Sequence, residues 1–391
     1  KIQCTASLFM EFFERLSIEL KIYQISSQRI VKKYCDYISE LKNQNSFLFS
    51  RMENVLSSKN LQEETSFIEV KDIATNQNFL FPIKLLFHGS NGYSAGNEEK
   101  EAIVHAIFEI VERFSQTLFI IKQTLSSKDD LITKSKKQFY SYDPNLFDEI
   151  SKFAPFIISK DSIEKEFPDL GDIIVSIEKK FDKFEVIDAS FDINGIRFYN
   201  YIVRQGKDDT NFKLFSSGGC HFDQRVALLR ALTESGQGYV AGEKLNQSWN
   251  GYLFTRKFIE IVFNSELEEK PLSKDKRVFN EMNEIYNECL KAFKSVLVFD
   301  CTNDKLNIPA YSVYIPELYS KSFLWSNIFC TSHVGDSDLI RVLGEQKISS
   351  VYNFITEKSI SGIESLFFLE NHNQLAEDIR EGVYNLYLSY L

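Results

Sequence analysis

The segment Ser90-Asn91-Gly92-Tyr93-Ser94-Ala95-Gly96-Asn97 leads into residues 98–113, which end in Glu109-Ile110-Val111-Glu112-Arg113. The first part is rich in small residues, and glycine lets backbone N–H groups come close to an anion. In the second part apolar residues recur at helical spacing, so the sequence predicts a loop that opens a helix. A helix N-terminus favours phosphate, and acids at i and i+3 lie on one helix face. The segment therefore predicts a phosphate-sized site with carboxylates on the same helix.

Two other segments repeat parts of this pattern. Near the start, Glu11-Phe12-Phe13-Glu14-Arg15 has the same ending, and Ser7 lies one turn before Glu11. In the middle of the chain, the glycine-containing segment 216–221 leads to Arg230, Glu234 and Gln237, at i, i+4 and i+7. Each helix thus places its acids along one face.

The acids of these helices lie among apolar residues. The first helix is apolar nearly all round, which predicts that it is buried. A buried carboxylate needs a partner, and two kinds fit. Arg15, Arg113 and Arg230 could each form an internal salt bridge, or a divalent cation such as Mg²⁺ could join the acids to nucleotide phosphates. The residues alone leave both open.

Together the three segments resemble the nucleotide-binding motifs of the YcaO family. The resemblance covers roughly residues 1 to 320 and includes the spacing between motifs. It implies a fold distinct from P-loop and kinase folds, binding of ATP with Mg²⁺, and activation of a peptide backbone amide by phosphorylation of its oxygen.

The resemblance also implies roles for particular residues. The Mg²⁺ ligands would be Glu11, Glu14, Glu109, Glu112 and Glu234. The ATP site would be lined by Ser7, Arg15, Ser94, Asn97, Glu101, Arg113, Arg230 and Gln237. Of these residues, Glu112, Arg230 and Glu234 would be catalytic.

The chain departs from the family pattern in three places. Tyr239 stands where the third motif has arginine, His105 stands where serine is common, and no proline follows Pro316, so the proline-rich tail of many azoline-forming members is missing. Azoline formation from Cys, Ser or Thr of a ribosomally made peptide is the expected reaction. Thioamide formation with external sulfide and a TfuA-like partner, and an inactive scaffold that recruits a peptide, stay as alternatives.

Composition limits the other function classes. The chain has 391 residues and a net charge of −10, which argues against a general nucleic-acid binder. No uncharged apolar run is long enough for a membrane span. Six cysteines without C-x-x-C spacing indicate reduced thiols in the cytoplasm; Cys220 lies beside the third motif. We expect a peptide or protein substrate and a leader-binding or TfuA-like partner, and leave a homodimer open.

The rest of the chain predicts an α+β (mixed α/β) fold. Residues 66–87 alternate as a β-hairpin, with Pro82 indicating an edge strand. Segments 182–203 and 294–315 share a helix–strand–turn–strand pattern, which predicts an internal duplication. Residues 124–143 read as an exposed charged loop and residues 277–293 as a helix. The expected domains are a catalytic domain over 1–336, lacking a natural N-terminal segment, and a helical extension over 337–391.

Overall fold

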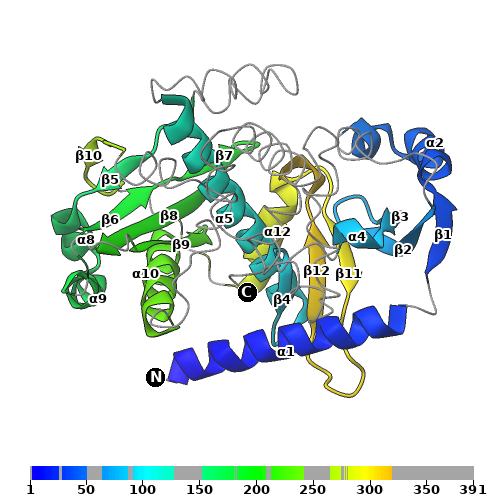
Figure 1. Ribbon diagram of the computed structural model, residues 1–391, viewed down its shortest axis with the longest axis horizontal. Helices are drawn as coiled ribbons and strands as arrows, with labels where there is room; N and C mark the ends of the chain where they lie inside the picture. Colours follow the sequence, from blue (N-terminus) through cyan, green and yellow to red (C-terminus); the bar gives the residue numbers. More distant parts are fainter. Residues whose placement is uncertain are drawn as a thin grey trace, which may run out of the picture. The chain divides into compact units, whose positions relative to one another are not determined.

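The computed structural model describes residues 2–25, 29–50, 64–86, 91–126, 152–179, 181, 183–207, 213–241, 265–273, 277, 279 and 281–318. The chain divides into two compact units, each with its own sheet (Figure 1). The first unit takes residues 1–114, 192–198 and 277–323, and the second takes 115–191, 199–276 and 324–391. The predicted extension at 337–391 and the division at residue 336 lie outside the described residues.

The sheet of the first unit combines strands from residues 30–95 with strands from residues 297–314. Its strands run in the order β1 (Ile30–Lys33), β2 (Glu64–Asp72), β11 (Leu297–Asp300), β12 (Ala310–Tyr314) and β4 (Tyr93–Ala95), and β3 (Gln77–Pro82) pairs with β2. All these pairs are antiparallel. The predicted hairpin is confirmed as β2 and β3. Of the described strands, β3 pairs only with β2, as Pro82 predicted.

Helices pack on this sheet through apolar side chains. The first unit contains α1 (Ile2–Ile25), α2 (Tyr34–Gln44), α4 (Ile83–Leu86), α5 (Glu99–Ser126) up to Phe114, and α12 (Met282–Ala292). Phe198 also belongs to this unit, and its ring lies 6.3 Å from that of Phe108 and 6.0 Å from that of Phe293. The predicted helix at 277–293 is confirmed by α12.

One prediction for α1 was wrong. Its sequence is apolar nearly all round, yet Phe12 is 58% exposed and Leu20 is 39% exposed. The helix contacts β4 and β12 with one side, and a helix against a sheet buries only a stripe of its surface (Figure 1). Apolar composition therefore overstated how many sides of α1 are covered.

Asp72 joins the early and late strands of the first unit. Its buried carboxylate accepts hydrogen bonds from Ser295 Oγ at 2.8 Å and from the backbone N–H of Val296 at 3.1 Å. The backbone N–H of Ala74 donates to the same side chain at 3.0 Å. A buried carboxylate with three donors is satisfied, and it fixes where β2 meets β11.

The second unit contains a mixed sheet of six strands. The order is β10 (Glu269–Lys270), β5 (Phe156–Ile158), β6 (Lys183–Asp188), β8 (Ile196–Lys207) and β7 (Phe191–Ile193), and β9 (Lys213–His221) pairs with β8. The helices α8 (Lys160–Glu166), α9 (Pro168–Glu178) and α10 (Gln224–Ala241) bury Ile163, Ile174 and Leu228 in a core with Val186 and Tyr201. The alternating apolar residues of β6 and β8 supply the sheet side of that core.

The two segments predicted as duplicates have the same element order. α9 precedes the antiparallel pair β6 and β8, and α12 precedes the antiparallel pair β11 and β12. The duplication itself stays a prediction. The charged segment at 124–143 lies outside the described residues except for its first three, which end α5.

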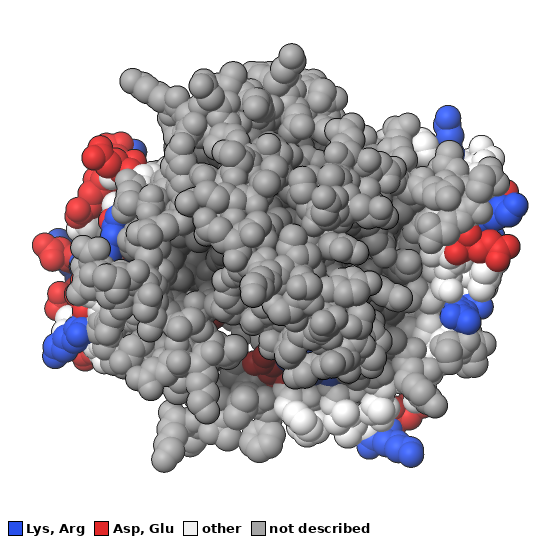
Figure 2. Space-filling model, in the orientation of Figure 1, with Lys and Arg blue, Asp and Glu red and all other residues white. Residues whose placement is uncertain are grey.

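In the second unit, exposed acidic side chains gather at the left of Figure 2, where α8, α9 and β10 lie in Figure 1. These residues are Asp161, Glu164, Asp169, Asp172, Glu268 and Glu269. Among the helices described above, none combines the length and apolar character needed to cross a lipid bilayer.

Candidate functional site

The acids of α1 point in two directions. Glu11 and Arg15 are exposed, and the Arg15 guanidinium lies 2.8 Å from Glu11 Oε1 in an i,i+4 pair. Glu14 is half-buried on the inner side of the helix. Ser7 belongs to α1, but its side chain lies outside the described residues. The salt-bridge interpretation thus fits Glu11, while Glu14 faces the interior.

The acids of α5 share one arginine. Glu112 is buried at 6% exposure and Glu109 is half-buried. The guanidinium of Arg113 lies 3.8 Å from Glu112 Oε1 and 4.0 Å from Glu109 Oε1. Both distances are longer than a charge-assisted hydrogen bond. Arg113 therefore lies within ion-pair range of both carboxylates.

The structure brings the first motif to the second. Burial, and to a lesser degree the nearby carboxylate of Glu109, raise the pKa of Glu14 to about 8 against the opposing effect of Arg15. Glu11 adds a smaller upward contribution. Two acids from helices far apart in the sequence therefore repel each other in a partly buried place.

This electrostatic environment fits a divalent cation. The two helices contribute four glutamates, Glu11, Glu14, Glu109 and Glu112, against two arginines. Mg²⁺ needs only one or two carboxylates when phosphate oxygens and water complete its shell. Among the described residues, no three His, Cys, Asp or Glu side chains converge as a preformed metal cage. The residues fit a metal bound together with a ligand rather than a closed structural site.

The start of α5 is held by its own side chains. The backbone N–H and the Nδ2 of Asn97 both donate to Glu101 Oε2, at 2.7 and 3.0 Å. Ser94 is buried, and its Oγ donates to the carbonyl of Ala95 at 3.3 Å. Three residues predicted to line the nucleotide site thus lie within one turn of the β4–α5 junction.

The segments read as glycine loops are partly strands, which corrects the sequence analysis. Residues 93–95 form β4 and residues 213–221 form β9. The glycines permit close packing: a Cβ on Gly96 would lie 2.7 Å from Ala102 N, and one on Gly219 would lie 2.2 Å from the carbonyl oxygen of Ala227. Gly92 in addition has a φ of 85°, which glycine adopts readily.

The third motif lies in the second unit, on α10. The backbone N–H of Gly218 in β9 donates to Glu234 Oε2 at 3.1 Å, and Arg230 is half-buried one turn before Glu234. Gln237 and Tyr239 belong to α10, but their side chains lie outside the described residues. The hydrogen bond from Gly218 was missed by the sequence analysis, because a backbone donor leaves no mark on residue type.

Three further residues have local surroundings that the sequence did not give. His221 Nδ1 accepts the backbone N–H of Asp223 at 2.9 Å, which stabilises the turn into α10. Cys220 is fully buried in β9, and His105 is half-buried in α5.

A family model described as "YcaO cyclodehydratase, ATP- and Mg²⁺-binding" matches residues 1–319. No curated protein sequence matches the chain. A solved heterocyclase in complex with substrate and cofactor is similar in fold, with a TM-score of 0.54 and 16% identity over 79% of this chain and 42% of that chain.

Two other structures are more distant. YcaO from Methanopyrus kandleri bound with AMPPCP and Mg²⁺ has a TM-score of 0.47 and 17% identity, over 64% of this chain and 63% of that chain. The E. coli microcin synthetase McbBCD complex has a TM-score of 0.41 and 12% identity, over 66% and 65%. The chain thus covers 42–65% of these proteins. On the family match over 1–319, the chain belongs to the YcaO family of ATP- and Mg²⁺-binding cyclodehydratases.

Proposed function

We propose that the chain uses ATP and Mg²⁺ to activate a backbone amide of a ribosomally made peptide, and that the product is an azoline. The family match over residues 1–319 supports ATP-dependent amide activation. The observation that supports the site is that the carboxylate of Glu109, in the second motif, helps to raise the pKa of Glu14, in the first motif, so the two lie within electrostatic range of each other.

The reaction balances as a dehydration in which ATP takes up the oxygen. The thiol or hydroxyl of a substrate Cys, Ser or Thr adds to the amide carbon and loses its proton. The former carbonyl oxygen takes the γ-phosphoryl group and leaves ADP. The C–O bond then breaks with loss of inorganic phosphate and of the amide N–H proton, which leaves a C=N bond in a five-membered ring.

The proposed roles of the residues follow from their placement. Glu14, Glu109 and Glu112, with Glu11 and Glu234, would hold Mg²⁺, which when bound neutralises charge on the transferred phosphoryl group. Ser94, Asn97 and Glu101, at the β4–α5 junction, would position the nucleotide together with Ser7, Arg15, Arg113 and Gln237. Arg230 would contact phosphate, as a planar guanidinium suits two phosphate oxygens.

The test combines turnover with product analysis. Purified full-length chain is incubated with MgATP and a peptide encoded beside its gene, with any partner protein encoded there. We expect phosphate release and loss of one water per ring in the peptide mass. Replacement of oxygen by sulfur would instead identify thioamide formation, and phosphate release that no peptide stimulates would contradict amide activation.

The matched variants are Glu112→Gln and Glu64→Gln. Glu112 is buried beside Arg113, and the amide keeps its shape without its charge. We expect a loss of about 100-fold or more in phosphate release, the scale of a lost transition-state contact. Glu64 is exposed at the start of β2, so its variant should keep full activity. Equal rates in both variants would favour the inactive scaffold.

A further inference from the structure

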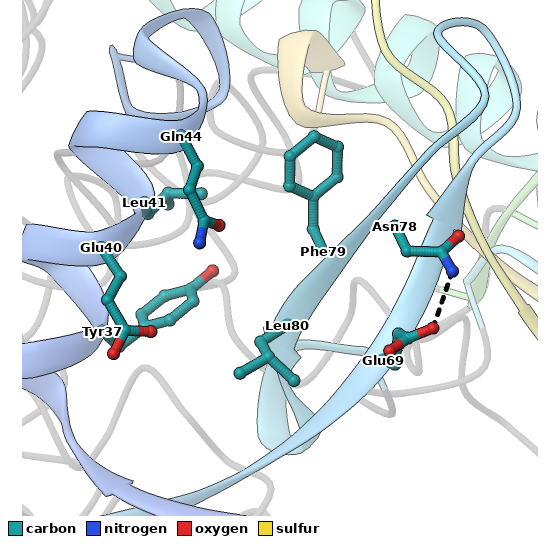
Figure 3. Close-up of a pocket in the computed structure, with 8 residues that line it drawn as sticks. All are labelled: Tyr37, Glu40, Leu41, Gln44, Glu69, Asn78, Phe79 and Leu80. Carbon is teal, nitrogen blue, oxygen red and sulfur yellow. Dashed lines mark hydrogen bonds between the residues drawn. The ribbon is translucent and has the colours of Figure 1, made fainter.

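A pocket of about 140 Å³ lies in the first unit between α2 and the β2–β3 hairpin (Figure 3). Its helix wall is Tyr37, Glu40, Leu41 and Gln44, which recur at i, i+3, i+4 and i+7 and so share one face of α2. Its strand wall is Glu69, Asn78, Phe79 and Leu80. None of these residues belongs to the three nucleotide motifs.

The Tyr37 hydroxyl lacks a partner at this pocket. The residue is 2% exposed, and its hydroxyl oxygen is buried with no hydrogen bond among the described residues. The ring is fixed by Phe67 of β2, with centroids 4.5 Å apart. In Figure 3 it reaches from α2 toward β3, with its oxygen in the space bounded by Gln44, Phe79 and Leu80. A buried hydroxyl without a partner costs free energy, and a polar ligand would recover it once the side chains that shield the oxygen from solvent moved aside.

The charges of the walls select a cation. Glu69 accepts a hydrogen bond from Asn78 Nδ2 at 2.7 Å, a neutral donor that leaves its charge uncompensated there. Glu40, on the opposite wall, is paired with Lys32 at 2.6 Å. The oxygens of Tyr37, Glu69 and Gln44 can all accept hydrogen bonds, while Leu80 and Phe79 supply apolar surface. This combination suits a long side chain with an apolar stem and a cationic head.

The size of the pocket limits what enters it. Sites for whole small molecules usually measure about 300–1,000 Å³, so this pocket admits the end of one side chain. A guanidinium offers five N–H donors and stacks on aromatic rings, which matches several acceptors beside Tyr37 and Phe79.

We propose that this pocket binds an arginine side chain presented by a separate polypeptide. Under the proposed function the chain acts on a peptide, so the separate polypeptide would be that substrate peptide. This identification of the occupant rests on the proposed function. The pocket would anchor that polypeptide on the first unit, through residues that take no part in nucleotide binding.

The test uses N-acetyl-arginine amide as the probe, titrated into the full chain without ATP and followed by saturation-transfer NMR. We expect saturable binding. The citrulline analogue has the same shape without charge and should bind about ten-fold more weakly or worse, the scale of one lost charge-assisted hydrogen bond. Free arginine has the same side chain but carries a charged ammonium and a charged carboxylate on its α-carbon, which a residue inside a polypeptide lacks. Tighter binding of free arginine than of N-acetyl-arginine amide would indicate a free amino acid as ligand and overturn the proposal.

Variants of the full chain distinguish binding in the pocket from nonspecific attraction of the cationic probe to an acidic protein. Glu69→Gln should weaken binding of the probe about ten-fold, whereas Glu64→Gln, on the same strand and likewise exposed but outside the pocket lining, should leave it unchanged. Tyr37→Phe keeps the ring but removes the hydroxyl, so it should weaken binding while leaving the melting temperature unchanged or higher. No saturable binding to the wild type, equal effects of Glu69→Gln and Glu64→Gln, or a lower melting temperature for Tyr37→Phe would each overturn the proposal. Because turnover is not measured, failure here leaves the proposed function untouched.

Discussion

The junctions β4–α5 and β9–α10 are built alike but hold their acids differently. Each runs from a strand that has one partner among the described strands into a helix that carries motif glutamates, with a closely packed glycine just after β4 (Gly96) and inside β9 (Gly219). On α10, Glu234 accepts a hydrogen bond from the backbone N–H of Gly218. On α5, Glu109 lies near another carboxylate, that of Glu14, and shares Arg113 with Glu112 at 3.8–4.0 Å. The two junctions thus place a carboxylate beside a backbone donor in the second unit and a carboxylate near another carboxylate in the first.

This difference indicates which junction has more need of an added cation. A carboxylate that accepts a backbone N–H is stabilised in its charged form, whereas facing carboxylates disfavour it. Under the proposed function, the acids of the first unit would therefore gain more from Mg²⁺ than Glu234 would. Three sets of variants test the comparison.

The largest expected effect is on packing at the glycines. Gly219→Ala would place a Cβ 2.2 Å from the carbonyl oxygen of Ala227 and 2.4 Å from Ala231 N, both backbone atoms. We expect a loss of about 3 kcal/mol in the free energy of unfolding, at the upper end of overpacking effects. Gly96→Ala, with its nearest contact at 2.7 Å, should cost less. Calorimetric melting of the wild type, Gly219→Ala and Gly96→Ala shows which substitution lowers the stability more.

A control for backbone strain is Gly195→Ala. Gly195 has a φ of 79° and no atom within 4 Å of an added Cβ, so only strain of about 1 kcal/mol applies. If Gly219→Ala melted no lower than Gly195→Ala, close packing of β9 against α10 would not be the reason for the glycine.

The next effect is the pH dependence of stability caused by Glu14. Its pKa is about 8 in the folded chain and 4.5 in the unfolded chain, so between these values the folded state binds the extra proton. The free energy of unfolding should therefore fall as pH rises from 4.5 to 8, by roughly 2 kcal/mol after allowance for partial solvent exposure. Glu14→Gln should remove this slope and be more stable than the wild type at pH 8 without metal.

Denaturation in EDTA at several pH values measures this effect. The same variant should lose Mg²⁺-dependent phosphate release, so stability and activity change in opposite directions. A Glu14→Gln protein that keeps the wild-type slope would show that Glu14 is not the buried carboxyl group whose raised pKa causes it.

The smallest effect is expected for Glu234→Gln. The side-chain carbonyl of glutamine can still accept the N–H of Gly218, so the free energy of unfolding should change by less than about 1 kcal/mol. Phosphate release should nevertheless fall if Glu234 acts on Mg²⁺ or phosphate as proposed. A large gain in stability, like that expected for Glu14→Gln at pH 8, would contradict the contrast between the two junctions.

The sequence predicted helices and strands better than it predicted which of their residues are buried or in contact. The β2–β3 hairpin, the edge position at Pro82 and α12 were found because their patterns are local. The exposure of Phe12 was not, since a one-dimensional pattern does not show how many sides of a helix are covered. Likewise the sequence predicted loops at β4 and β9. Glycine occurs both in turns and where two elements pack closely, and the residue type alone does not tell the two apart.

The motifs named the acids but could not show which of them meet. Glu14 and Glu109 are distant in sequence, and the electrostatic effect of one on the other depends on how α1 and α5 lie in the first unit. The Tyr37 pocket has a local signal on α2, the stripe at i, i+3, i+4 and i+7, but its strand wall comes from a separate hairpin. Residue type can therefore suggest a site, while tertiary contacts decide its electrostatics.

The link from Asp72 to Ser295 has a consequence for synthesis of the chain on the ribosome. Strands β1 to β4 are synthesised early, and their sheet is complete only after β11 and β12 have been synthesised. Most of the second unit is translated in between, so it can fold while the first unit is still unfinished. Until β11 and β12 are made, the apolar residues of β2 and β3 lack part of their sheet. We therefore expect a chaperone to bind the nascent chain most readily while the second unit is being translated.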